Sequence, residues 1–225
     1  MAVQRQAGST RQPVTRERAI RAAVDLADAD GIAAVSMRKL AARLGVEAMS
    51  LYYHVKNKDE LLDGMIEQVY SEISVPSIGV AWKPAMRQRA ESTREVLGRH
   101  PWAIGMIDER TTVAGMTQLN AVIGTLRHAG FSVALAAHAM SLLDSYAHGF
   151  AQQEASLPTD ETGDIGDVTE SIMAQQELMA SLPHLAEMAT ELILQPGYAY
   201  RHEFDFGIGL ILDGIEAAHQ AEPAK

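Results

Sequence analysis

Apolar residues recur along most of this chain with the spacing of an α-helix. Positions i, i+3, i+4 and i+7 form one buried helical face, and such stripes run from Thr15 almost to the C-terminus, with Gly, Pro, Asp and Ser between them. No stretch has the alternating pattern of a strand, so the fold class that we predict is all-α. The expected helices cover residues 15–29, 36–44, a short segment after 46, 57–73, 82–99, 101–108, 112–129, 132–156, 170–182, 183–194 and 201–220.

One break in this pattern divides the chain. Ser74 to Gly79, which includes Pro76, interrupts the helical spacing and marks a domain boundary. The helix before it, 57–73, starts with the capping-box spacing of Asn57 and Glu60 and is the natural link between the two parts. We expect a flexible arm at 1–14, an N-terminal three-helix domain at 15–74 and a C-terminal helical domain at 80–220.

Residues 36–58 have the pattern of a helix-turn-helix. Ser36 can cap a short helix, and Gly45 supplies the positive φ that a tight turn requires. In the helix that follows, Leu51 and Val55 face inward. The open side carries tyrosines, a histidine and a methionine in place of the usual Glu, Lys and Gln, so we expect a partner to cover it. The alternative is an ordinary helical hairpin with a solvated polar side.

The open side and its charge favour double-stranded DNA as the partner. The whole chain has a net charge of -10, but residues 1–58 hold ten Lys and Arg against five Asp and Glu. Basic side chains donate to phosphates, while hydroxyl, aromatic and methyl groups contact sugars and base edges. Arg38 and Lys58 are expected at phosphates. The full set of expected DNA-binding residues is Ser36, Arg38, Ala48, Met49, Ser50, Tyr52, Tyr53, His54 and Lys58.

Motifs in both halves point to one known family. The first half contains Gly-Ile at 31–32, Ser-Met-Arg-Lys-Leu-Ala at 36–41, Leu-Gly-Val at 44–46 and Leu-Tyr-Tyr-His-Val-Lys-Asn-Lys at 51–58. With these motifs it resembles the DNA-binding domain of the tetracycline-repressor (TetR) family. Arg-His-Pro-Trp at 99–102, His-Ala-Gly-Phe-Ser at 128–132 and residues 142–150 resemble the regulatory domain of tetracycline-repressor-like proteins. The resemblance implies a ligand-gated, homodimeric transcriptional repressor that binds a palindromic operator.

A small-molecule effector would lie between helices of the C-terminal domain, where the largest apolar cavity is expected. Simple core packing is the alternative for each apolar candidate. Asn120 is the exception, because an amide among apolar neighbours must find a partner, which a small molecule with polar atoms would supply. In our alignment, Ile107 and Gly115 stand where the tetracycline repressor uses side chains near its drug and magnesium. We therefore expect a different, largely apolar effector bound without metal. The candidate effector-binding residues are Trp82, Met86, Trp102, Met106, Met116, Asn120, Ile123, Leu143, Tyr146 and Phe150.

Several other classes of protein do not fit the sequence. The chain has no cysteine, which excludes disulfides and suits a reducing cytoplasm. We expect a cytoplasmic protein without a membrane partner, because no apolar run is long enough to span a bilayer and the N-terminus has no signal-peptide core. His138 and His148 are too far apart along one helix to share an ion, so no metal or cofactor is expected. Hydrolase and nucleotide-binding motifs are also missing, which argues against an enzyme.

The last helix predicts a second copy of the chain as partner. Residues 204–215 are apolar on more than one side and include three glycines, which suits a two-fold interface completed by 132–150. A fully buried core helix is the alternative. Two functional alternatives also remain open at this point: a sequence-tolerant DNA-binding protein without an effector, and an enzyme on a helical scaffold.

Overall fold

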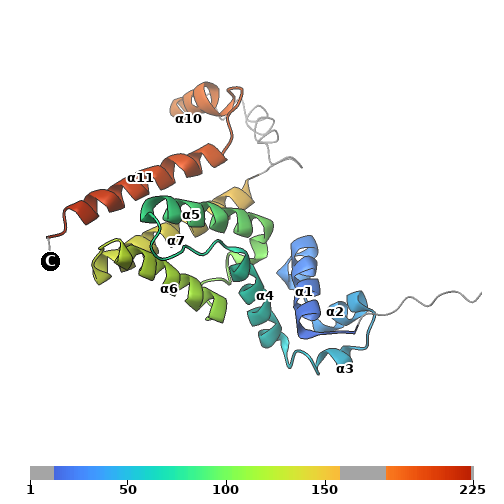
Figure 1. Cartoon of the computed structure of the whole chain (residues 1–225). Helices are drawn as coiled ribbons and strands as arrows, with labels where there is room; N and C mark the ends of the chain where they lie inside the picture. Colours follow the sequence, from blue (N-terminus) through green and yellow to red (C-terminus); the bar gives the residue numbers. More distant parts are fainter. Residues whose placement is uncertain (1–12, 158–180, 224–225) are drawn as a thin grey trace, which may run out of the picture. The chain divides into compact units, whose positions relative to one another are not determined.

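The computed structural model describes residues 13–157 and 181–223 of the 225-residue chain. Within these ranges every regular element is a helix, which confirms the all-α fold class (Figure 1). The chain divides into two compact units, residues 1–68 and 69–225. Residues 170–180 of the expected helix at 170–182 lie outside the described residues, and Ser181 and Leu182 are not helical.

The first unit is built from short helices. They are α1 (Arg16–Asp30), η1 (Ile32–Ala34), α2 (Met37–Leu44), α3 (Ala48–Leu51) and the larger part of α4 (Lys58–Glu72). The hydroxyl of Thr15 caps α1 by accepting from Arg18 N at 3.2 Å. The core consists of side chains with almost no exposed surface, among them Ala19, Ala23, Leu40, Leu51, Leu61, Met65 and Ile66.

Two local signals set the helix-turn-helix. Ser36 Oγ accepts from Lys39 N at 3.2 Å at the start of α2, and Gly45 adopts the left-handed conformation (φ 70°, ψ 33°) at its end. A residue without Cβ enters this region at no steric cost. Val46 N then donates to Ala41 O at 3.0 Å and turns the chain toward α3.

The helix after the turn is shorter than we expected. α3 ends at Leu51, and Tyr52, Tyr53 and His54 form a turn in which His54 N donates to Leu51 O at 2.9 Å. No side chain caps α3, and paired tyrosines are weaker helix formers than Leu, Lys or Glu. α4 then starts where Asn57 Oδ1 accepts from Glu60 N at 2.8 Å.

The second unit contains the longer helices. They are α5 (Trp82–Arg99), η2 (Pro101–Ala103), α6 (Val113–His128), α7 (Val133–Ser156), α10 (Pro183–Met188), the π-helical η3 (Ala189–Ile193) and α11 (Arg201–Gln220). α7 lies against α5, α6 and α11 (Figure 1). The expected helix at 101–108 is only η2 followed by turns, since Gly105 is costly inside a helix. The expected helix at 183–194 changes to π geometry at Ala189.

The second unit has one continuous apolar core from α5, α6, α7 and α11. Its members include Met86, Val122, Leu126, Phe131, Leu143, Phe150, Phe204, Ile208 and Leu212. Phe131, at the corner between α6 and α7, stacks on His219 with ring centroids 3.9 Å apart. Ion pairs surround this core: Lys83 Nζ lies 2.7 Å from Asp213 Oδ1 and 2.6 Å from Glu216 Oε2, which ties α5 to α11.

Candidate DNA interface and effector cavity

The first unit presents most of the expected DNA-binding side chains to solvent. Tyr53 is 88% exposed, Met49 71% and Tyr52 43%, and His54 is also exposed. Leu51 and Val55, at 0% and 1%, anchor α3 and the following turn to the core. Burial of these two residues therefore holds the aromatic and methionine side chains outward.

Cations surround this exposed face. They are Arg38, Lys39, Arg43, Lys56 and Lys58, all of them exposed. None forms a salt bridge with a residue that the structure describes, so their charge is available to phosphates. Phosphate contacts of this kind position a protein on a duplex, and contacts to base edges select the sequence.

Ser36, Ala48 and Ser50 are less open than the rest of the set, since all three are half-buried. Ser36 Oγ is occupied as the acceptor of the α2 cap, and Ser50 Oγ donates to Glu47 O at 2.7 Å. Their hydroxyl groups serve local structure, so the outermost positions for base contacts are Met49, Tyr52, Tyr53 and His54.

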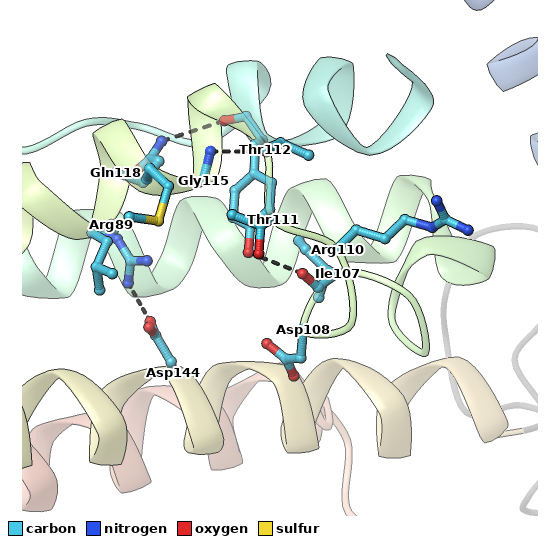
Figure 2. A pocket seen from close by; sticks show the side chains of 12 residues that line it. Arg89, Ile107, Asp108, Arg110, Thr111, Thr112, Gly115, Gln118 and Asp144 are labelled. Atoms are coloured by element: carbon cyan, nitrogen blue, oxygen red, sulfur yellow. Dashed lines mark hydrogen bonds and ion pairs between the residues drawn. The ribbon is translucent and has the colours of Figure 1, made fainter. Parts of the chain in front are cut away.

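The second unit contains a cavity of about 220 Å³ between the end of α4, α5, the segment before α6, α6 and α7 (Figure 2). Its floor and walls mix apolar and polar groups. The lining residues are Tyr70, Arg89, Ile107, Asp108, Arg110, Thr111, Thr112, Gly115, Met116, Gln118, Leu119 and Asp144.

Two buried polar side chains line the cavity with part of their hydrogen-bonding capacity unused. The side chain of Arg89 is 7% exposed, and its Nη1 lies 2.5 Å from Asp144 Oδ1 (Figure 2). Gln118 is 2% exposed, and its Nε2 donates to Ile73 O at 2.7 Å and Tyr70 O at 3.3 Å. Arg89 Nε and Gln118 Oε1 are buried and have no partner among the described residues.

Tyr70, in the last turn of α4, forms another part of the wall. Its hydroxyl donates to Ile107 O at 3.2 Å. Burial raises the pKa of Tyr70, and the nearby Asp108 and Asp144 raise it further, so the phenol stays protonated. A Cβ at Gly115 would lie 3.0 Å from Tyr70 Cε2, so glycine allows the ring to approach α6 closely.

The cavity contains only one of the ten predicted effector-binding residues, Met116. Trp102 and Met106 are half-buried near η2 and do not line it. The remaining apolar candidates, which are Trp82, Met86, Ile123, Leu143, Tyr146 and Phe150, belong to the core or pack against it. For these residues the structure favours core packing, which was the alternative interpretation.

The environment expected for Asn120 was wrong. Asn120 is exposed and borders an open hollow that it shares with Met116, Thr117 and the start of α6. The buried amide of α6 is Gln118 instead. The sequence held the signal, because Gln118 lies four residues before Val122 and eight before Leu126, on the same face of the helix.

A second hollow, an open groove between α7 and α11, is almost wholly apolar. It is lined by Leu135, His138, Ala139, Leu142, Leu210, Ile211, Gly214, Ile215 and Ala218. Leu142, Leu210 and the neighbouring Phe206 are exposed, with 58% of Leu210 accessible. The alternative interpretation of α11 as a fully buried core helix is therefore wrong for a single chain.

Not every glycine of α11 faces this groove. Beside Gly207, a Cβ would lie only 2.1 Å from the hydroxyl of Tyr146 in the same chain. This glycine permits close packing of α11 on α7 within the chain, so of the three glycines expected to suit a two-fold interface, Gly207 does not face a partner. Gly214, which has open space beside it, is the glycine that lines the groove.

In residues 13–157 and 181–223 no group of three or more His, Asp or Glu side chains is arranged to hold a metal ion. None of the helices in the same ranges has both the length and the apolar character needed to cross a bilayer.

An exposed helix-turn-helix face joined to a helical domain with a partly open cavity is typical of a ligand-responsive transcriptional regulator. Residues 19–65 match the family model of the bacterial regulatory proteins of the tetR family, and residues 75–219 match that of the tetracyclin repressor-like C-terminal domain. The chain therefore belongs to the TetR family of transcriptional regulators, as a ligand-responsive DNA-binding repressor and not an enzyme.

Individual relatives support this assignment. The chain is 32% identical over 214 residues to the HTH-type transcriptional repressor DrrR1 of Streptomyces coeruleorubidus, covering 90% of this chain and 77% of that protein. It is 33% identical over 212 residues to an HTH-type transcriptional regulator of Saccharopolyspora erythraea, covering 92% and 87%. The structure of the Streptomyces coelicolor TetR family protein ActR in complex with actinorhodin is similar, with a TM-score of 0.73, 27% identity and coverage of 94% and 100%.

Proposed function

We propose that this repressor binds a palindromic operator as a homodimer and that a small molecule in the cavity of the second unit releases it. The observation that carries the proposal is the position of α4. This single helix starts directly after the exposed face of the first unit, and its last turn forms part of the cavity wall in the second. A change at the cavity thus has a continuous helix through which to act.

DNA recognition is assigned to α3 and the turn after it. Met49, Tyr52, Tyr53 and His54 would meet base edges and sugars in a major groove, while Arg38 and Lys58 hold phosphates. Lys58 is the first residue of α4, and its exposed side chain places a positive charge beside the recognition turn. Two such faces related by a two-fold axis would read the two halves of a palindrome.

The groove between α7 and α11 is assigned to the homodimer. Leu142, Phe206 and Leu210 are large, apolar and exposed, and an exposed apolar surface of this kind usually marks an interface. A second copy would pack its own α7 and α11 against the same pair in an isologous four-helix arrangement. Gly214, on the groove, would allow the helices to approach closely.

The effector is assigned to the 220 Å³ cavity. The likeness to ActR, whose structure was determined with actinorhodin, supports a small-molecule effector. Occupation of the cavity would shift the last turn of α4, which Gln118 and Tyr70 tie to the wall. A preference of about 1 to 3 kcal/mol for the shifted state is enough to lower operator occupancy several-fold or more.

Selection of binding sites from random DNA tests the proposal. We expect an enriched sequence with two-fold symmetry, bound more tightly than scrambled DNA at physiological salt. Candidate effectors are then titrated into the protein–operator complex, and release is followed by fluorescence anisotropy of labelled DNA. Failure to enrich any symmetric sequence would contradict the proposal of a palindromic operator. A ligand that binds the cavity equally well with and without operator would contradict the proposed coupling between effector binding and DNA binding.

A further inference from the structure

We propose that the effector carries two polar groups on its apolar body: a neutral carbonyl-type acceptor that meets Arg89 and a hydroxyl or N–H donor that meets Gln118. This inference rests on the proposed use of the cavity as the effector site. It narrows the effector from any small apolar molecule to hydroxy-carbonyl compounds and their N–H equivalents.

Arg89 defines the acceptor. Its side chain is 93% buried, and its Nη1 is engaged by Asp144, but Nε is buried with no partner among the described residues (Figure 2). A buried donor without an acceptor is unfavourable. Nε has almost no accessible surface in this structure, so the guanidinium must turn for a ligand oxygen to reach it, and that contact would remove the penalty. Asp144 already balances the guanidinium charge, and Asp108 lines the same cavity. A neutral carbonyl oxygen therefore fits better than a second carboxylate.

Gln118 defines the donor. Both hydrogen bonds made by its amide come from Nε2, to the carbonyl oxygens of Ile73 and Tyr70. These two bonds fix which end of the amide points to α4, because exchanging nitrogen and oxygen would set the oxygen against two carbonyl acceptors. Oε1 is then left buried without a partner. Only a donor group can satisfy it, and a hydroxyl or N–H of the ligand provides one.

The rest of the lining accounts for the apolar body. Ile107, Met116 and Leu119 supply apolar surface between the two polar positions. A volume of about 220 Å³ suits a ring compound of modest size. The lining as a whole is more polar than apolar, so the site favours a ligand whose apolar body carries several polar groups.

Gln118 also links ligand chemistry to α4. The amide whose oxygen would accept from the ligand is the same one that donates to the last turn of α4 and to Ile73 just beyond it. Movement of this amide toward a ligand must lengthen or redirect those bonds. Gln118 is thus expected to set both the ligand preference and the size of the response.

A fragment series tests the two polar positions. Binding of the three isomers of hydroxyacetophenone is compared with acetophenone (acceptor only), phenol (donor only), ethylbenzene (neither) and 4-hydroxybenzoate (anionic) by ligand-observed NMR at millimolar concentration on the full chain. We expect at least one hydroxyacetophenone to bind about tenfold more tightly than acetophenone or phenol, since each hydrogen bond contributes up to about a factor of ten.

Variants then locate the contacts. Arg89→Lys keeps the charge opposite Asp144 but removes Nε. Gln118→Met keeps the length of the side chain but removes the whole amide, which is Oε1 together with the Nε2 bonds to Tyr70 O and Ile73 O. Each variant should bind that hydroxyacetophenone about tenfold more weakly. The loss of affinity caused by Arg89→Lys should equal the loss that the wild-type chain shows when the ligand carbonyl is removed, from acetophenone to ethylbenzene. Arg87→Lys and Gln88→Met, on α5 outside the cavity, are the matched controls. Thermal melts establish folding, and Arg89→Lys decides the matter alone if Gln118→Met does not fold.

The outcomes separate this inference from the cavity assignment. Ethylbenzene binding as tightly as the hydroxyacetophenones, or no effect of the two variants, would overturn the inference and leave the cavity as effector site. Binding that persists unchanged in Leu119→Trp, which fills the cavity, would overturn the assignment of the cavity itself. The inference also fails if no member of the series binds.

Discussion

Replacement of Gly207 by alanine probes the contact between α11 and α7. The added Cβ would lie 2.1 Å from Tyr146 Oη and 2.6 Å from Cζ, far inside van der Waals contact. The Tyr146 hydroxyl must then leave its acceptors, Glu203 O at 3.0 Å and Phe204 O at 3.2 Å. Overpacking costs about 1 to 3 kcal/mol and the lost hydrogen bond about 1 kcal/mol, while alanine returns about 1 kcal/mol of helix propensity.

We expect Gly207→Ala to lower the free energy of unfolding by about 2 kcal/mol, or the melting temperature by about 4 to 8 °C for a unit of this size. Calorimetry and urea unfolding provide the measurement. Gly98→Ala is the control, because a Cβ there meets open space on α5, and it should be neutral or slightly stabilising.

A double variant isolates the cause. Adding Tyr146→Phe to Gly207→Ala removes the hydroxyl that the new methyl group meets, so it should recover part of the lost stability. If Gly207→Ala proves as stable as Gly98→Ala, the close packing of α11 on Tyr146 is refuted.

Further predictions concern DNA, assembly and pH. Tyr52→Ala should lower the binding free energy for operator DNA by about 1 to 3 kcal/mol and that for random DNA only slightly. Lys58→Ala should weaken binding to both DNAs alike and reduce by about 1 the slope of log binding constant against log salt concentration. Anisotropy titrations at several salt concentrations test both variants. Leu210→Glu, in the groove, should give folded monomers in sedimentation, and an unchanged dimer would place the interface elsewhere. Hydrogen bonds from Ser132 lower the pKa of Glu222. The stability that ionised Glu222 contributes is therefore present above its pKa in the unfolded state and is lost as the pH falls through its pKa in the folded state. Glu222→Gln should make the free energy of unfolding depend less on pH in the acid range.

Local signals predicted the fold well. The observed α5 has the expected bounds, and Ser132 caps α7 as its position before a long apolar pattern indicated. The left-handed Gly45 and the exposed tyrosines after α2 also follow from short-range chemistry. These features depend on residues within one or two helical turns of each other, which a single sequence displays directly.

Features that depend on distant neighbours were harder to predict. Asn120 and Gln118 are both amides in α6. The spacing to Val122 and Leu126 places Gln118 on their face of the helix, but which face of α6 is buried depends on the helices that pack against it. The cavity likewise forms where residues from four separate segments meet, and its charged members, such as Arg89, look like ordinary surface residues in the sequence.

The contact of Phe131 with His219 has a consequence for the order in which the chain folds. This corner between α6 and α7 is closed by a ring from the last turn of α11, and Ser132 N donates to Glu222 Oε2 at 3.1 Å beside it. Ribosomes add about 5 to 20 residues per second, so the partner of Phe131 leaves the ribosome several seconds after Phe131 itself. Until then the α6–α7 hairpin exposes an aromatic side chain that is fully buried in the finished protein. A nascent chain of this repressor is thus most open to aggregation, and to chaperone binding, in the interval before its final helix emerges.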